Sequence, residues 1–196
     1  FRWMIGGSWP EGVQPLLWAQ SDHALSGLGV AQMKNGFSHV GLSTHDMEAT
    51  IDFYQKTLGF ECTADNQISV EEGGHLRQVI FDIGAGEFIA FMESHDVPDI
   101  PKDYDTGINE ALGVPNMFYH FALSVETPEA LTAKRNELIA KGVRVSSLVH
   151  HGPGKSFYVK DPNQIQLEFT ASMRELDAND STGSFTIRRA MLDPED

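Results

Sequence analysis

Two stretches of the chain share one pattern of apolar and polar positions. Residues 37–43 read Phe-Ser-His-Val-Gly-Leu-Ser and residues 118–124 read Phe-Tyr-His-Phe-Ala-Leu-Ser. The alternation in each stretch predicts a strand. A helical pattern follows each strand and ends before Gly59 in the first copy and before Gly142 in the second. The recurrence of strand, helix and glycine in one order indicates a single supersecondary unit used twice.

Apolar runs bounded by turn residues complete each unit with three more predicted strands. They cover residues 60–64, 77–83 and 87–92 in the first unit, and residues 143–150, 156–160 and 165–170 in the second. The sequence therefore predicts an α+β fold of two βαβββ modules. The predicted organisation is an N-terminal arm with three tryptophans (1–35), a first module (36–95), a connector (96–116), a second module (117–170) and a tail (171–196).

Composition excludes several classes of function. The 196 residues carry a formal net charge of −14, which argues against binding to nucleic acid and disfavours anionic membranes. No stretch approaches the roughly 20 apolar residues of a spanning helix. The single cysteine, Cys62, allows no intrachain disulfide and favours a reducing compartment, so we expect a cytoplasmic protein. The tryptophan-rich arm favours a homodimer.

The repeated strands carry the candidate chemistry. His39 and His120 occupy equivalent positions, and a small residue follows each of them two positions later. Glu168 lies in the last predicted strand of the second module, where a buried carboxylate is costly unless it is paired or bound to a metal. Either histidine alone could be a hydrogen-bonded core residue. Together, two imidazoles and one carboxylate suit Fe(II), and also Mn(II) or Zn(II).

A fourth ligand in the first module would change the chemistry, and Glu93 is the candidate. Aligning Gly86 with Gln164, the residues before the last strand of each module, places Ala90 opposite Glu168. Glu93 is an odd number of positions from Ala90, so it is predicted to face away from the site and toward solvent. A site with three protein ligands is therefore favoured.

Two βαβββ modules, a histidine in the first strand of each and a glutamate in the last strand resemble the vicinal oxygen chelate superfamily. This superfamily includes glyoxalases, fosfomycin-resistance enzymes, bleomycin-binding proteins and extradiol ring-cleaving dioxygenases. The resemblance covers residues 36–171. It implies modules that pair edge to edge into an open, cup-shaped mixed sheet around a metal.

Residues 149–168 resemble the signature of extradiol dioxygenases. His151, the pair Phe157-Tyr158, the turn Asp161-Pro162 and Glu168 fall in place, whereas Gln164 stands where that signature has Gly or Pro. The resemblance implies that His151 is a proton donor or base and that Tyr158 bonds a substrate oxygen. In the alternative, His151 is only a strand-end residue beside a Gly-Pro-Gly loop.

Residues 154–163 and 86–93 are also similar to fosfomycin-resistance enzymes, although Gly41 stands where many of those enzymes have a catalytic threonine. The first expectation is an Fe(II) dioxygenase that cleaves a small catechol-like substrate with O2. The second is a Mn or Zn lyase, isomerase or thiol transferase using the same three ligands. The third is a protein that binds a small molecule such as an antibiotic.

Overall fold

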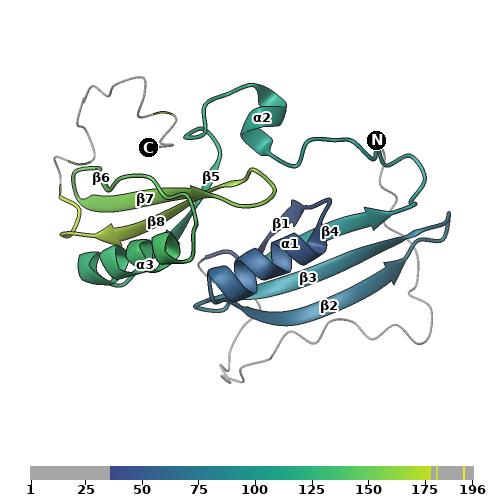
Figure 1. The fold of residues 1–196 in the computed structure, drawn as a ribbon, viewed down its shortest axis with the longest axis horizontal. Helices are drawn as coiled ribbons and strands as arrows, with labels where there is room; N and C mark the ends of the chain where they lie inside the picture. Colours follow the sequence, from purple (N-terminus) through teal and green to yellow (C-terminus); the bar gives the residue numbers. More distant parts are fainter. Residues whose placement is uncertain (1–35, 178–179, 181–191, 193–196) are drawn as a thin grey trace, which may run out of the picture. The chain divides into compact units, whose positions relative to one another are not determined.

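A computed structural model describes residues 36–177, 180 and 192 (Figure 1). The predicted arm and most of the predicted tail lie outside these residues. The first module contains β1 (His39–Ser43), α1 (Met47–Ile51), the π-helical segment η1 (Asp52–Thr57), β2 (Glu61–Ser69), β3 (His75–Gly84) and β4 (Glu87–His95). After α2 (Ile108–Leu112), the second contains β5 (His120–Ser124), α3 (Pro128–Ala140), β6 (Val149–His150), β7 (Gly154–Lys160) and β8 (Gln166–Ser172).

Each module forms its own mixed sheet of four strands. The strand orders are β1-β4-β3-β2 and β5-β8-β7-β6, and in both sheets the first strand runs parallel to the last while the other pairs are antiparallel. The predicted α+β fold with a repeated βαβββ unit is therefore confirmed. In both sheets of the described residues, the strand that begins with the histidine of the repeated pattern, β1 or β5, lies at an edge.

Local signals in the sequence set the helix bounds. The side chain of Asp46 accepts a hydrogen bond from the backbone N–H of Ala49, and the hydroxyl of Thr127 accepts one from Ala130. The first helix widens into η1, whose last turn is closed by a bond from Leu58 N–H to the Phe53 carbonyl. Gly59 and Gly142 then adopt positive φ angles of 85° and 81°, which end the helices as predicted.

One predicted strand is much shorter than expected. Residues 143–150 were expected to form a strand by their apolar pattern, but only Val149 and His150 do so. Ser146 fixes the preceding segment instead: its backbone N–H donates to the Tyr158 carbonyl and its hydroxyl accepts from the Tyr158 N–H. The hydroxyl thus supplies a contact that a strand partner would otherwise make.

Within the described residues, most of the buried apolar side chains form one cluster that spans both modules. It includes Tyr54 from η1, Phe91 from β4, Leu131 from α3 and Phe169 from β8. Strand β8 contributes Leu167, Phe169 and Ala171 to this cluster. The alternate positions Gln166, Glu168 and Thr170 therefore face away from the helices. The period of two therefore places Glu168 on the opposite face of its sheet from the core.

The modules meet on their helix sides. The Tyr54 hydroxyl donates to the Asp161 carboxylate at 3.1 Å, and the side-chain amide of Asn163 donates to the Thr50 hydroxyl at 3.1 Å. Lys134 of α3 donates to the carbonyl of Leu58 at the end of the first helix. The edge-to-edge pairing implied by the resemblance is not found in the described part of the chain, because β1 pairs with β4 and β5 pairs with β8. The other edge of each histidine strand is left without a strand partner there.

Candidate functional site

The second module brings His120 and Glu168 together. The parallel pairing of β5 with β8 places Ala122 opposite Glu168, two pairs beyond His120 and Gln166. Across this small residue, the Nε2 atom of His120 lies 2.9 Å from Oε2 of Glu168. Both side chains are largely covered, with 27% and 11% of their surfaces exposed. A close imidazole–carboxylate pair therefore stands on the face of the sheet away from the helices.

The other nitrogen of His120 also has a fixed partner. Its Nδ1 atom lies 3.1 Å from the carbonyl oxygen of Met117. The pKa of His120 is raised, first by its hydrogen bond to Glu168 and then by the charge of that carboxylate, against the effect of burial. Burial by itself raises the pKa of Glu168, but hydrogen bonds from His120 and Ser156 outweigh it and lower the pKa below its usual value.

Tyr158 and His151 extend this pair into a chain of polar groups. Tyr158 lies opposite Glu168 in the pairing of β7 with β8, and its hydroxyl is 2.8 Å from Nε2 of His151. Burial, followed by the charge of Glu168, raises the pKa of Tyr158 well above its usual value, so the phenol stays protonated near neutral pH. Four of the five predicted site residues thus belong to one connected cluster.

Ser156 is a member of this cluster that the sequence analysis missed. It is fully buried, its hydroxyl donates to the Thr170 hydroxyl at 2.9 Å, and it helps to lower the pKa of Glu168. The signal that could have found it is strand parity, because Ser156 lies two positions before Tyr158 in β7 and so shares its face.

His39 does not join the cluster. It is an exposed residue at the start of β1, with Nδ1 3.3 Å from the hydroxyl of Ser38. Among residues 36–177, 180 and 192, no group of three or more His, Cys, Asp or Glu side chains is placed to hold a metal ion. A single chain therefore assembles two of the three predicted ligands, and the metal site remains a prediction.

The first module has an equivalent face, on which Ala90 stands in the position of Glu168. Gly41 pairs with Ala90, as Ala122 pairs with Glu168, which agrees with the alignment of the two modules. A Cβ atom added to Gly41 would meet no atom of residues 36–177, 180 and 192 within 4 Å. An apolar cavity of about 440 Å³ opens here, lined by Gly41, Leu42, Ser43, Met92, Thr106 and Ile108.

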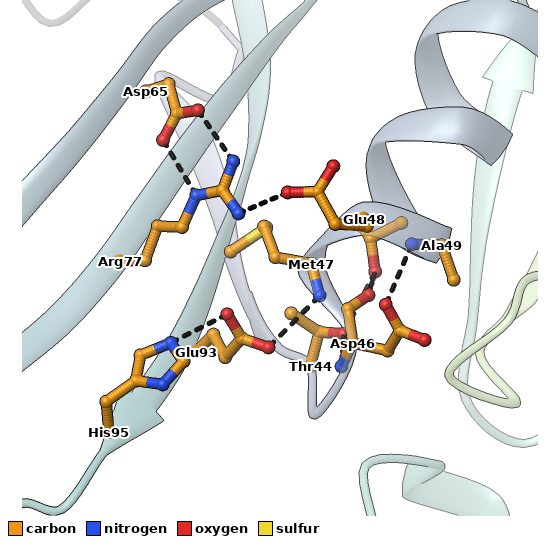
Figure 2. Close-up of polar contacts among 10 residues, drawn as sticks. Thr44, Asp46, Met47, Glu48, Ala49, Asp65, Arg77, Glu93 and His95 are labelled. Carbon is orange, nitrogen blue, oxygen red and sulfur yellow. Dashed lines mark hydrogen bonds and ion pairs between the residues drawn. The ribbon is translucent and has the colours of Figure 1, made fainter.

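Glu93 points to the helix side, as its parity relative to Ala90 predicts. Its Oε1 atom accepts a hydrogen bond from the backbone N–H of Met47 at 3.2 Å, and its Oε2 atom lies 2.8 Å from Nε2 of His95 (Figure 2). The expectation that it faces solvent is wrong, since only 13% of the side chain is exposed. The start of α1 covers it, which the strand pattern could not indicate.

Comparisons with solved structures agree with this fold. SMU.1112c is 24% identical, with a TM-score of 0.53, and the match covers 71% of this chain and 99% of that one. The antibiotic-binding protein TnmS3 from Streptomyces sp. CB03234 is 19% identical, with a TM-score of 0.50 and coverage of 72% and 98%. Lactoylglutathione lyase from Agrobacterium tumefaciens is 16% identical, with a TM-score of 0.50 and coverage of 71% and 96%.

At these levels of identity the likeness concerns the fold alone. No curated protein sequence matches the chain. Among the described residues, no helix is long and apolar enough to cross a membrane. A sequence profile, in contrast, matches residues 36–169, which include both modules and all five predicted site residues. The chain therefore belongs to the Glyoxalase/Bleomycin resistance protein/Dioxygenase superfamily.

Proposed function

We propose that the protein is a metal-dependent enzyme of this superfamily, with His120 and Glu168 as two of its metal ligands. The observation that carries the proposal is the arrangement around His120. Its Nδ1 atom faces a carbonyl oxygen, which can only accept, so this nitrogen carries a hydrogen. In a neutral imidazole the lone pair then lies on Nε2, the atom that is 2.9 Å from the Glu168 carboxylate.

The lone pair on Nε2 of His120 and the carboxylate oxygen of Glu168 repel each other at 2.9 Å unless a proton or a cation lies between them. A proton on Nε2 supplies it in the metal-free protein, in agreement with the raised pKa of His120. A divalent cation bound to both atoms would replace that proton. The Met117 carbonyl would then act as the outer partner that orients a ligating histidine through its second nitrogen.

The third ligand is proposed to be His39 of the partner subunit in a homodimer. Among the strands of the described residues, β1 and β5 both lie at a sheet edge, and each begins with its histidine. Large apolar side chains are exposed just before them, with Phe37 73% and Phe118 60% exposed. A two-fold dimer that pairs β1 of one chain with β5 of the other would cover these edges twice and complete two equal sites.

The other members of the cluster fit a reaction that moves protons. A bound divalent cation would polarise the oxygens of a chelating substrate. A substrate hydroxyl beside Tyr158 can pass its proton to the phenol oxygen while the phenol proton moves to Nε2 of His151, 2.8 Å away. Imidazole is the side chain suited to accepting that proton near neutral pH.

The finer proposal is Fe(II)-dependent ring cleavage of a small catechol-like substrate with O2. It is supported by the resemblance of residues 149–168 to the extradiol signature, by the contact of His151 with Tyr158, and by the apolar cavity beside Gly41, which suits an aromatic ring. The alternative is a Mn(II)- or Zn(II)-dependent lyase, isomerase or transferase that uses the same ligands as a Lewis-acid site.

The test is anaerobic reconstitution of the full chain with Fe(II), followed by oxygen uptake in the presence of a series of catechols. We expect uptake by the native protein, and none by the His120→Ala and Glu168→Ala variants. The His150→Gln variant is the matched control, because it changes an exposed strand histidine next to His151. Stoichiometric metal without oxygen uptake would refute the dioxygenase and favour the alternative. A metal stoichiometry that is the same in His120→Ala and Glu168→Ala as in the native protein would refute the site itself.

A further inference from the structure

A second pair of histidines lies at the far end of the first module, on the helix side of its sheet. His75 of β3 and His95 of β4 are directly opposite each other in the antiparallel pairing. Their rings stack with centroids 4.6 Å apart and planes inclined by 14°. Two cross-strand imidazoles this close bring together two ligands of the kind that Zn²⁺ and Cu²⁺ prefer.

The backbone around this pair is tightly constrained. Gly74 precedes His75 in a turn closed by hydrogen bonds between Val70 and Gly74 and between Gly73 and Val70. A Cβ atom added to Gly74 would lie 2.4 Å from the carbonyl oxygen of His95, and the φ angle of Gly74 is +72°. The turn therefore lies directly against the end of β4, beside the backbone of His95.

Glu93 fixes the tautomer of His95. Its Oε2 atom lies 2.8 Å from Nε2 of His95, and its Oε1 atom accepts from the Met47 N–H at the start of α1 (Figure 2). A carboxylate can only accept, so Nε2 of His95 carries the hydrogen. In the neutral ring, the lone pair then lies on Nδ1. A histidine held through one nitrogen by a carboxylate is the arrangement in which the other nitrogen commonly binds a metal.

The neighbouring charges are already paired with one another. Arg77, which is opposite Glu93 in the strand pairing, bonds Asp65 with two nitrogens and Glu48 with a third (Figure 2). On the other side, Lys102 pairs with Asp96 at 2.8 Å. The carboxylate of Glu93 therefore forms its hydrogen bonds with His95 and with the first backbone N–H of α1.

We propose that His75 and His95 bind a divalent cation of the Zn²⁺ or Cu²⁺ type, at a site separate from His120 and Glu168. Nδ1 of His95 and one nitrogen of His75 are the ligands, water fills the other positions, and Glu93 is a positioning residue. A metal lies in the plane of each imidazole that binds it, so the nearly parallel rings must turn as it enters. This is in keeping with the finding that the described residues hold no ready-made group of three ligands.

Zn²⁺ titration of the metal-free full chain at neutral pH, followed by calorimetry, tests the proposal. The native protein is expected to bind one equivalent that disappears in both His75→Gln and His95→Gln and persists in His120→Ala. The exposed-histidine variant His150→Gln serves as control and should bind as the native protein does. Unchanged Zn²⁺ binding in both His75→Gln and His95→Gln, with native circular dichroism, would overturn the proposal. The equivalent lost in His120→Ala belongs to the proposed catalytic site, so the two proposals fail independently.

Two further measurements do not depend on deleting a ligand. One equivalent of Cu²⁺ added to the His120→Ala variant should give an electron paramagnetic resonance spectrum with coupling to two imidazole nitrogens, and a spectrum without nitrogen coupling would overturn the proposal. In Glu93→Gln, the amide can donate to Nε2 of His95 and so move the ring hydrogen to Nδ1. We expect ¹⁵N spectra to report this change and Zn²⁺ affinity to fall about tenfold. An unchanged affinity after the tautomer has changed would exclude Nδ1 as the ligand.

Discussion

Replacing Tyr54 by Phe tests the polar contact that joins the two modules. Tyr54 is completely buried, and its hydroxyl donates to Oδ2 of Asp161 at 3.1 Å, across 107 positions of the chain. The ring packs against Phe81 and Phe91, with centroids 5.3 and 4.9 Å away. Phenylalanine keeps these ring contacts, so the substitution removes one hydrogen bond and creates no large cavity.

The expected magnitude follows from what remains around Asp161. A hydrogen bond to a charged group contributes about 1.5–3 kcal/mol. The Oδ2 atom that loses Tyr54 keeps the side-chain amide of Asn163 at 3.1 Å, and Oδ1 keeps the backbone N–H groups of Asn163 and Ile165 at 2.8 Å each. The carboxylate is therefore not left without partners. We expect the free energy of unfolding to fall by about 1.5 kcal/mol, at the lower end of the range.

The assay is urea unfolding at pH 7, followed by circular dichroism at one fixed protein concentration, because dimerisation would make stability concentration-dependent. The urea concentration at the midpoint of unfolding should fall, and the dependence of the unfolding free energy on urea concentration should stay the same. Tyr104→Phe is the matched control. Within the described residues, Tyr104 forms a hydrogen bond to His45 through its backbone carbonyl and not through its hydroxyl, so a change below about 0.5 kcal/mol is expected.

A double-mutant cycle decides whether the Tyr54 hydroxyl acts through Asp161. If it does, Tyr54→Phe should cost clearly less in an Asp161→Asn background, since contacting residues are not additive. Equal costs in both backgrounds would refute the reasoning. So would a loss below about 0.5 kcal/mol in the native background, since the contact would then contribute little to the union of the modules.

Two further predictions concern the same turn between β7 and β8. Burial raises the pKa of Asp161 above its usual value, against the hydrogen bonds that it accepts, so the folded protein holds this proton more tightly than the unfolded chain. The stability gained is present at pH values below the unfolded pKa of about 4 and is lost as the pH rises through the folded pKa. In urea unfolding, Asp161→Asn should therefore lower the free energy of unfolding more at pH 4 than at pH 7. A loss of stability that is larger at pH 7 would contradict this sign. Gln164 adopts a φ angle of +61°, which glycine tolerates without strain. Gln164→Gly should therefore raise the unfolding free energy by up to about 1 kcal/mol, and a loss of thermal stability would show that the Gln164 side chain outweighs the backbone strain.

Much of the candidate site could be predicted from local patterns. The repeated heptapeptide indicated two equivalent strands, and the cost of a buried carboxylate singled out Glu168, which the structure has beside His120. Tyr158, which lies opposite Glu168, came from the resemblance of residues 149–168 to the extradiol signature and not from strand parity. Strand parity directed Glu93 away from the face of Ala90. Such inferences hold because side-chain direction along a strand is set by the backbone itself and needs no knowledge of the partner.

The remaining features depend on how distant segments meet. The apolar pattern of residues 143–150 is compatible with a strand, but Ser146 forms hydrogen bonds to the backbone of Tyr158 that hold the segment otherwise. Glu93 was expected in solvent because nothing in β4 indicates that the start of α1 covers it. The approach of His75 to His95 depends on the register of β3 against β4, which is a pairing of two separate strands.

The sequence by itself determined the two modules, their order of strands and helices, and the side of its strand to which Glu93 points relative to Ala90. Only the tertiary structure decided that the modules of one chain meet through Tyr54 and Asp161 on their helix sides, which leaves His39 apart from His120 and Glu168. The physical reason is that a sequence pattern describes only local structure. Periodicity reports the few ångströms of backbone around each residue, whereas the union of two modules rests on buried hydrogen bonds and apolar contacts between segments about a hundred residues apart.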